Sequence, residues 1–433
     1  MKTIMSAFLI LYMISADLKS QTGWISQNSN FNKHLNDVFF INSGTGWTVS
    51  DSSKVLKTTD SGNSWNVQTL PYYSQLYTIF FIDENTGWTG GSYWYIFHGG
   101  SIFKTTNGGN DWFSLITTID ARSIYFINSV TGFAAINNSQ DFSSGGSIIK
   151  TTNGGSNWTI IPSNHEFCSI AFKDEVTGYI LGHYWDDTGN DTNFVYRTTD
   201  TGENWDIVYA ERNEQFYYGH FRDISVQGSN VWVSGSDSSI LRSSDNGENW
   251  SKQFYINPRI MNSIWFIDNN TGWAVGYRYP DSSNIIKTTN GGMNWFNLRN
   301  NAGNGLNSVM FLNEYTGWAA GDNGIILKTT TGGLTFVNNN VNVMPAFYSL
   351  GQNYPNPFNP VTSIEFALPL QGMVTMKIFD VLGNEKETII NEDKPAGNYK
   401  ITFSGEQLSS GIYYYSLFID KIPVKTRKMV LIK

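Results

Sequence analysis

Short segments in which apolar and polar residues alternate recur along the chain from residue 22 to about residue 340, separated by turns rich in Gly, Asn and Asp. Alternation with a period of two residues is typical of a β-strand that buries one face. In the first unit these segments cover residues 38–41, 46–49, 55–58 and 65–68. The pattern therefore predicts four short strands, a to d, that recur in each later unit.

The turn between strands c and d defines the repeat. Its first copy reads TTDSGNSW over residues 58–65, and the arrangement occurs seven times at intervals of 41 to 47 residues. The closing aromatic residues are Trp65, Trp112, Trp158, Trp205, Trp250, Trp295 and Phe336. A period of about 40–50 residues with four strands per unit predicts an all-β, seven-bladed β-propeller. Residues 23–26 resemble a spare strand d, which we expect to complete the last blade and close the ring.

The composition of this turn has a physical explanation. Its Asp or Asn side chain can accept hydrogen bonds from backbone N–H groups of its own turn, its Gly accepts a positive φ, and its Trp can bury a ring between blades. We therefore expect a structural role for each Asp or Asn and for the Trp that follows it. These residues are Asp60, Trp65, Asn107, Trp112, Asn153, Trp158, Asp200, Trp205, Asp245, Trp250, Asn290 and Trp295.

The spacing of this turn resembles the Asp box of bacterial neuraminidase (BNR) repeats. The whole period, a Gly-aromatic pair followed by a Lys-Thr-Thr-Asn-Gly-Gly-x-x-Trp element, resembles the propeller family of photosystem II stability and assembly factors over about residues 22–340. The resemblance implies the fold but no single activity, because Asp-box propellers serve sialidases, endoglucanases, sorting receptors and assembly factors.

Composition narrows the classes of function. The 433 residues have a net charge of −8, with 15% charged and 15% aromatic residues. So much aromatic area excludes disorder as the main state, and the acidic balance argues against nucleic acid as the main partner. The single cysteine, Cys168, excludes an intrachain disulfide framework and a Cys-based zinc site. No cofactor and no metal site is predicted, because no two His residues have a metal-ligand spacing.

The two ends of the chain differ from the repeats. Residues 1–20 resemble a secretory signal peptide, with Lys2, an apolar segment over residues 4–14 and small residues after it. No later segment is long and apolar enough to be a transmembrane segment. All 15 Trp precede residue 344, whereas seven of the 11 Pro follow it. We therefore expect a signal peptide at 1–20, the propeller at 21–343 and a separate domain at 344–433.

The C-terminal segment predicts a small Ig-like β-sandwich with strands at residues 363–368, 374–379, 387–390, 397–403, 411–419 and 424–432. Its motif residues are Tyr354, Pro355, Asn356, Pro357, Phe358, Asn359, Pro360, Gly411, Tyr413 and Lys428. In this order they resemble the type A C-terminal sorting domain of the type IX secretion system. The resemblance implies that the secretion machinery is a partner and that the propeller is secreted or displayed at the outer cell surface. We expect a bare terminal strand that is recognised by strand addition.

Propeller topology separates the loops into two sets. The a–b and c–d turns share one face and are uniform, whereas the b–c and d–a loops share the other face, vary in length and contain all five His residues. Variable loops on a rigid ring commonly carry binding, so we predict a glycan- or protein-binding surface there. The alternative is that these aromatic rings only pack against their own loops. The candidate residues are Tyr93, Trp94, Tyr95, His183, Tyr184, Trp185, Tyr217, Tyr218 and Arg278.

A sialidase-like or other glycoside hydrolase is the main alternative, and an assembly or scaffold factor is another. A sialidase needs an arginine cluster, for which the candidates are Arg122, Arg222, Arg278 and Arg299. A carboxylate pair for glycoside hydrolysis has as candidates Asp186, Asp187, Glu166, Glu211 and Glu214. We assign no catalytic residue, because no Arg-Ile-Pro signature occurs near the start of the repeats. A basic residue also recurs in every strand c, from Lys57 to Lys328. These residues could form an anion-binding ring, but we expect each side chain to pack along its strand and reach solvent with its charged end.

Overall fold

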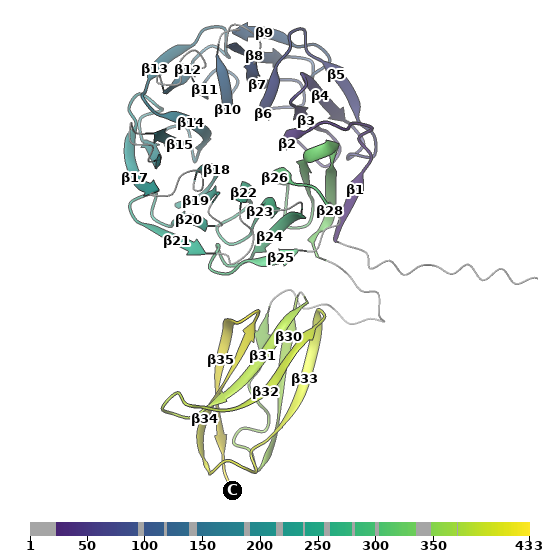
Figure 1. Cartoon of the computed structure of the whole chain (residues 1–433), viewed down its shortest axis with the longest axis vertical. Coiled ribbons are helices and arrows are strands. Elements are labelled where there is room, and N and C mark those ends of the chain that lie inside the picture. Colours follow the sequence, from purple (N-terminus) through teal and green to yellow (C-terminus); the bar gives the residue numbers. More distant parts are fainter. Residues whose placement is uncertain are drawn as a thin grey trace, which may run out of the picture.

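The computed structural model describes residues 23–93, 99–116, 119–137, 145–185, 191–213, 220–236, 239–254, 260–278, 282–298, 303–334, 348–369 and 371–433. Its strands form a ring of small sheets and a separate C-terminal β-sandwich (Figure 1). The predicted all-β class with seven blades and a sandwich is confirmed. The predicted signal peptide at residues 1–20 and the predicted domain boundary at 343/344 lie outside the described residues.

Each blade is a four-stranded antiparallel sheet, with strand a nearest the axis (Figure 1). Blades 1 to 3 contain β2 (Leu35–Phe40), β3 (Gly46–Ser50), β4 (Lys54–Thr58), β5 (Asn66–Thr69), β6 (Gln75–Phe81), β7 (Gly87–Tyr93), β8 (Gly99–Thr105), β9 (Phe113–Ile116), β10 (Asp120–Phe126), β11 (Gly132–Asn137), β12 (Gly146–Thr151) and β13 (Thr159–Pro162). Blades 4 to 6 contain β14 (Glu166–Phe172), β15 (Gly178–Trp185), β16 (Asp191–Thr198), β17 (Asp206–Asn213), β18 (Phe221–Gln227), β19 (Asn230–Gly235), β20 (Ser239–Ser243), β21 (Trp250–Phe254), β22 (Ile260–Phe266), β23 (Gly272–Arg278), β24 (Ser282–Thr288) and β25 (Phe296–Leu298). Blade 7 contains β26 (Leu306–Phe311), β27 (Gly317–Gly321), the 3-10 helix η1 (Asp322–Gly324) and β28 (Ile326–Gly333).

The first strand of the chain closes the ring. β1 (Gly23–Gln27) pairs antiparallel with β28, so the fourth strand of blade 7 comes from the N-terminal end. Trp24 is 2% exposed and meets the ring of Phe311 edge-on, with 5.6 Å between the ring centroids. Trp24 therefore occupies the place of a closing Trp in blade 7. Phe336, which the repeat spacing assigned to that place, lies outside the described residues.

Six of the seven blade boundaries contain the same three-ring contact, which we call the aromatic unit. It consists of a strand b ring, the last Phe of strand a in the next blade, and the closing Trp of that next blade. Between blades 1 and 2, Trp47 stacks on Phe81 with centroids 3.6 Å apart, and Trp112 meets Phe81 edge-on at 6.0 Å. The other stacked pairs are Trp88–Phe126, Phe133–Phe172, Trp232–Phe266, Trp273–Phe311 and Trp318–Phe40. Each unit buries a large apolar area between blades.

The Gly that precedes the strand b ring makes room for this Phe. A Cβ at Gly46 would lie 2.4 Å from the ring of Phe40, and five other glycines at the same position have the same relation to their own Phe. Blade 5 departs from the pattern at both positions, with Val231 in place of the Gly and Val226 in place of the Phe. At the boundary between blades 4 and 5, Tyr179 therefore packs in a mixed apolar cluster that includes Val226 and Phe221.

A ring of hydrogen bonds joins the seven inner strands. Strand a has a register shift at the same position in every blade, between Leu35 and Asp37 in blade 1. The side chain that follows this bulge bonds to the next strand a, since a bulge re-aims the residues around it. Asp37 Oδ2 accepts the N–H of Ile79 at 2.9 Å. The equivalent contacts are Thr78–Ile124, Ser123–Ile170, Ser169–Asp223, Asp223–Ile264, Ser263–Val309 and Ser308–Val38.

Two side chains hold each c–d turn, which we call the box turn. In blade 1, Thr58 Oγ1 accepts the N–H of Gly62 at 2.8 Å, and Asp60 Oδ1 accepts the N–H of Ser64 at 2.9 Å. The corresponding oxygens of Asn107, Asn153, Asp200, Asp245 and Asn290 accept the equivalent N–H groups. Gly62 has a φ of 89°. The Asp and Asn side chains are thus used within their own turns, together with a Thr or Ser hydroxyl that the sequence analysis did not single out.

The recurring basic residue of strand c is partly exposed in six blades and buried in blade 6, so the expectation that it reaches solvent is wrong for Lys287. Lys287 is 7% exposed and its Nζ lies 4.7 Å from the ring centroid of Trp273. Lys104 Nζ also donates to the carbonyl of Gly154, in the box turn of the next blade, at 2.9 Å. Burial lowers the pKa of Lys287 to about 8. These side chains link neighbouring blades, because the next box turn presents carbonyl oxygens to them.

The C-terminal domain packs two sheets face to face. One contains β29 (Ser349–Leu350), β30 (Val361–Leu368) and β33 (Gly397–Ser404), and the other contains β32 (Glu385–Lys394), β31 (Gly372–Phe379), β34 (Gly411–Ile419) and β35 (Ile422–Leu431). All six predicted strands are present, with ends that differ by a few residues. The core between the sheets includes Ile364, Met376, Tyr415 and Leu417, each buried.

Replacement of a stacked ring should destabilise the propeller strongly. Trp273→Ala removes a side chain that is 0% exposed, and we expect the free energy of unfolding to fall by about 3–5 kcal/mol. Phe113→Ala, at a ring that is 55% exposed, should change it by less than about 0.5 kcal/mol. Denaturant unfolding followed by Trp fluorescence measures both. Equal effects of the two changes would contradict the role of the aromatic unit.

Stability should depend on pH through the buried Asp37. Burial raises the pKa of Asp37 from 3.8 to about 7, although hydrogen bonds from Ile79 and Ser308 act in the opposite direction. A carboxyl with a raised folded-state pKa contributes stability below its unfolded pKa and loses it as the pH rises through 7. From pH 4 to pH 8 the wild type should therefore lose on the order of 4 kcal/mol relative to Asp37→Asn, which cannot ionise. Denaturant unfolding at several pH values measures the free energy of unfolding of both proteins. An equal change with pH in the two proteins would contradict the raised pKa of Asp37.

Candidate functional site

The two faces of the propeller differ in how their loops are held. On one face each box turn bonds to the a–b turn, as where the N–H of Ser61 donates to the carbonyl of Gly44 at 2.8 Å. On the other face the b–c and d–a loops meet, as where the N–H of Ser53 donates to the carbonyl of Ser74 at 2.9 Å. On the first face, hydrogen bonds therefore join the two turns of each blade in the same way. The second face, which we call the variable-loop face, carries the loops that differ between blades.

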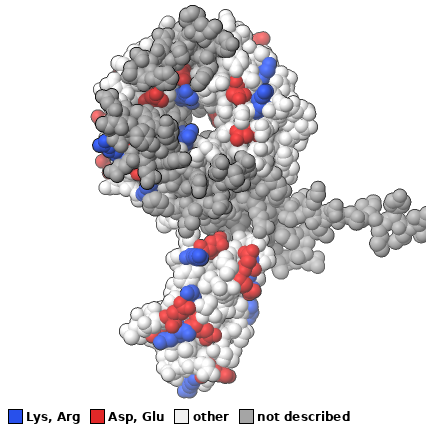
Figure 2. Space-filling view, in the orientation of Figure 1, with Lys and Arg blue, Asp and Glu red and all other residues white. Residues whose placement is uncertain are grey.

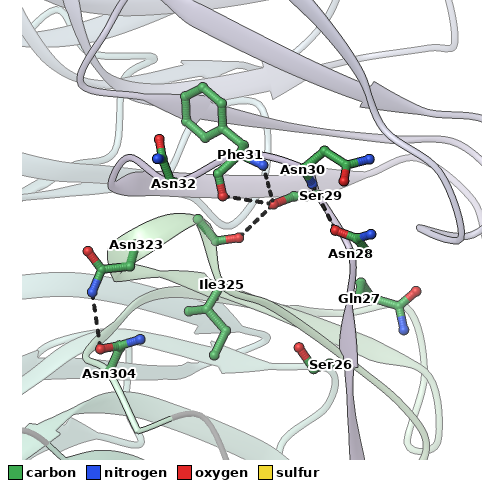
Figure 3. Close-up of a pocket in the computed structure, with 11 residues that line it drawn as sticks. Ser26, Gln27, Asn28, Ser29, Asn30, Phe31, Asn32, Asn304, Asn323 and Ile325 are labelled. Atoms are coloured by element: carbon green, nitrogen blue, oxygen red, sulfur yellow. Dashed lines mark hydrogen bonds between the residues drawn. The ribbon is translucent and has the colours of Figure 1, made fainter.

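A cavity of about 470 Å³ lies on the variable-loop face where blades 7 and 1 meet. Figure 3 shows its two sides, formed by β1 with the segment after it and by the turn around Asn323. Ser29 Oγ donates to the carbonyl of Gly324 at 2.8 Å, and Asn323 Nδ2 donates to Asn304 Oδ1 at 3.1 Å. Five Asn, two Ser and one Gln are among the 11 lining residues, which include no Asp, Glu, Lys, Arg or His. We call this site the amide cavity.

Most of the residues predicted to bind a ligand either end a strand or lie outside the described residues. Tyr93, Trp185 and Arg278 are the last residues of β7, β15 and β23, and their side chains are outside the described part of the structure. Trp94, Tyr95, Tyr217 and Tyr218 also lie outside the described residues. A binding role for these seven residues stays a prediction.

His183 and Tyr184 lie in strand β15 rather than in a loop, because the β15–β16 hairpin of blade 4 is longer than its counterparts. Tyr184 is 39% exposed and its ring meets that of His165 edge-on at 5.5 Å. His165 also stacks on Phe194 at 4.4 Å between centroids and contacts the hydroxyl of Tyr196. Burial, with a smaller effect of His183, lowers the pKa of His165. Tyr184 thus belongs to a cluster within its own blade.

The candidate groups for glycoside hydrolysis are engaged in separate contacts where they are described. Arg122 donates to Asp120 at 2.7 Å and its guanidinium lies 4.4 Å from the ring centroid of Tyr77. Burial raises the pKa of Asp120, and Arg122 acts in the opposite direction. Arg222 Nε donates to Ser236 at 3.1 Å. Glu211 accepts from Lys252 at 2.8 Å.

The remaining candidate groups are described only in part. Glu166 faces His183 at 3.5 Å. Asp186, Asp187, Glu214 and Arg299 lie outside the described residues, as does the side chain of Arg278.

Figure 2 shows both red and blue atoms near the central opening of the propeller, as separate small groups. A surface for nucleic acid instead needs a continuous basic patch that follows the phosphates. The described surface in this view shows no such continuous basic patch.

The predicted sorting motif covers the outer edge of β35. The N–H of Phe358 donates to the carbonyl of Val430 at 2.9 Å, and the N–H of Ile432 donates to the carbonyl of Phe358 at 3.0 Å. Asn356 Oδ1 accepts the N–H of Val430 at 2.9 Å. The expectation of a bare terminal strand is therefore wrong for this part of β35, because the motif pairs with it. Phe358 is 2% exposed, whereas Tyr354 is 82% exposed.

The other motif residues belong to the same region of the sandwich. Gly411 begins β34 opposite Leu431, and the N–H of Gly405 donates to the carbonyl of Pro360 at 2.7 Å. Tyr413 is 8% exposed and its hydroxyl donates to the carbonyl of Ser409 at 2.9 Å. The carbonyl of Lys428 accepts from Gln352 at 2.7 Å. Pro355 accepts from Asn353, and Pro357 and Asn359 lie in the same segment.

Comparison with known families supports both domains. A family model described as photosynthesis system II assembly factor YCF48 matches residues 16–161 and 160–260, which together are more than half of the 433 residues. The chain belongs to the YCF48 family. A second family model, described as a secretion system C-terminal sorting domain, matches residues 352–433. The chain therefore carries a type IX sorting domain that directs the YCF48-like propeller to the cell surface or to secretion.

Solved structures share the propeller fold at low identity. YCF48 bound to a D1 peptide is 17% identical with a TM-score of 0.52, and the match covers 71% of this chain and 97% of that one. YCF48 from Cyanidioschyzon merolae is 15% identical with a TM-score of 0.50, covering 71% and 98%. The WD40 propeller of Doa1 is 11% identical with a TM-score of 0.51, covering 71% and 97%. No curated protein sequence matches the chain. Among the described residues, no helix is long and apolar enough to cross a membrane.

Removal of residues 348–433 should block export of the YCF48-like propeller, because the matched sorting domain would be lost. We expect the truncated protein to accumulate in the periplasm, whereas the full chain appears at the cell surface or in the medium. Fractionation followed by immunoblotting measures the distribution. Tyr354→Ala serves as a point variant, since Tyr354 is exposed and its loss should leave the sandwich folded. Normal export of the truncated chain would exclude the sorting role.

Proposed function

We propose that the exported propeller is a non-catalytic binding module that takes a glycan or protein ligand on its variable-loop face. The amide cavity is the observation that carries this proposal. It is formed where the ring closes, so its two sides are held by the pairing of β1 with β28 and by the hydrogen bond from Ser29 to Gly324. A preformed cavity of this kind loses little conformational freedom on binding.

The chemistry of the cavity suits a glycan better than a charged ligand. Each Asn side chain offers an acceptor oxygen and two N–H donors, which matches the donor and acceptor character of sugar hydroxyls. Within the described residues the side-chain amides of Asn30 and Asn32 make no hydrogen bond, although Asn28 Oδ1 accepts the backbone N–H of Asn30 at 3.1 Å. Phe31 adds an aromatic residue to the same lining. The uncharged lining also explains why an anionic polymer is a poor candidate.

A protein ligand is the second candidate. A solved YCF48 relative is bound to a peptide, and peptides also present backbone donors and acceptors to amide side chains. A scaffold role of this kind needs no catalytic group. A glycoside hydrolase requires two carboxylates on either side of the scissile bond, and the 11 residues that line the amide cavity include none.

Glycan arrays and peptide libraries probed with the full-length chain test this proposal. The double change Asn30→Ala and Asn32→Ala should weaken ligand binding roughly tenfold or more, since each lost hydrogen bond is worth about 1 kcal/mol. Asn66→Ala, at an exposed Asn on β5, is the matched control and should bind as the wild type does. Glycan binding that depends on the cavity supports the first candidate, and peptide binding that depends on it supports the second. Binding that is insensitive to the double change would overturn the assignment.

A further inference from the structure

Three metal-ligating side chains meet on the variable-loop face at the boundary between blades 4 and 5. His183 lies in β15, Asp191 is the first residue of β16, and His220 directly precedes β18 of the next blade. The register places His183 opposite Asn193 and Trp185 opposite Asp191, so His183 and Asp191 project from the same face of the hairpin. Asn193 Oδ1 accepts the N–H of Phe221 at 3.3 Å, which holds His220 beside that face.

The distances among these side chains match a shared ion. Asp191 Oδ2 lies 3.0 Å from His220 Nδ1, and Asp191 Oδ1 lies 3.5 Å from His183 Nδ1. One ligand atom from each residue lies within 4.8 Å of the other two. Tetrahedral zinc, with bonds of about 2.0–2.2 Å, holds its ligand atoms about 3.3 Å apart. Small side-chain rotations are therefore enough to bring all three atoms onto one ion.

Burial makes these side chains unlike a solvated surface cluster. The Asp191 side chain is 6% exposed, and those of His183 and His220 are 15% and 21% exposed. Asp191 Oδ1 is buried and accepts no hydrogen bond from the described residues. The Asp191 carboxyl thus lies between the two imidazoles, with one oxygen toward each ring.

The surroundings of His183 supply the outer contact that metal-bound imidazoles usually have. Glu166 Oε2 lies 3.5 Å from His183 Nε2, the ring nitrogen opposite the one that faces Asp191. A carboxylate at this place orients the ring and raises its basicity as a ligand. Glu166 and His183 are paired across β14 and β15, so the strand register fixes the arrangement.

We propose that His183, Asp191 and His220 bind a single Zn²⁺ ion that fastens blade 5 to blade 4. Two imidazoles and a carboxylate form a set of nitrogen and oxygen ligands. Such a set binds Zn²⁺ in preference to Mg²⁺ or Ca²⁺, which favour oxygen ligands alone. The fourth position belongs to water or to a ligand on the variable-loop face.

The site lies at the one boundary where Val226 replaces the stacked Phe, so a metal link would act where the aromatic contact is weakest. Sequence spacing did not indicate it, because the hairpin and the blade boundary bring the residues together. The site is independent of the amide cavity.

Calorimetric titration of the metal-free, full-length chain with ZnCl₂ tests the proposal. We expect one Zn²⁺ per chain and a higher Tm in the presence of zinc, since an ion that binds only the folded state stabilises it. His220→Ala and Asp191→Asn should each weaken zinc binding at least tenfold. Glu166→Gln, which keeps all three ligands, should weaken it by roughly tenfold. His34→Ala is the matched control, because His34 forms an exposed pair with Asp322 on the same face at 2.8 Å; it should bind zinc as the wild type does.

Two results would overturn the site. One is the absence of stoichiometric zinc binding by the wild type, and the other is equal zinc affinity in the wild type, His220→Ala and Asp191→Asn. Substitution of Co²⁺ in the wild type gives a readout that does not depend on how the variants fold. Intense visible absorption of the cobalt protein indicates a four-coordinate protein site and supports the proposal. The weak spectrum of hydrated Co²⁺ contradicts it.

Discussion

The stacking of a strand b ring on the Phe of the next blade is the contact on which the propeller depends. A four-stranded sheet has two faces and cannot bury both alone, so each blade is stable only between two neighbours. Trp47 and Phe81, 3.6 Å apart, provide this burial at one boundary, and a small residue at Gly46 lets Phe40 lie against the backbone at another. The Phe of strand a and the Gly of strand b depend on each other. In blade 5 both are replaced by Val.

Much of the fold follows from the sequence because the same four-strand unit recurs seven times. The blade count, the strand order and the closure by residues 23–26 were all predicted from spacing and alternation, and the structure confirms them. The contacts of the basic residues of strand c with the next blade were not predicted, for a physical reason. Alternation shows which face of its own strand Lys104 occupies, but it does not show that the next blade places the carbonyl of Gly154 2.9 Å away.

The candidate sites were much harder to predict, since each depends on residues that only the closed ring brings together. Ser29 and Gly324 are 295 positions apart in the sequence, yet both line the amide cavity and a hydrogen bond joins them. The insertions that contain aromatic residues predicted a binding surface on the variable-loop face. Tyr184, one of these residues, instead packs against His165 within blade 4. In the sorting domain the motif was found from its order, whereas its pairing with β35 was not, because a Pro-rich segment gives no strand alternation.

Ring closure also constrains the order of events during export. The closing strand β1 begins at Gly23, directly after the predicted signal peptide, and its partner β28 ends at Gly333. The last blade can therefore form only when both ends of the propeller are on the same side of the inner membrane, and this contact has the largest sequence separation in the ring. The sorting domain follows β28 in the chain, so the whole propeller is made before the segment that directs export. Because the chain has a single cysteine, no intrachain disulfide can hold the closed ring, and its persistence outside the cell depends on the packing of Trp24 against Phe311 and on the six stacked pairs.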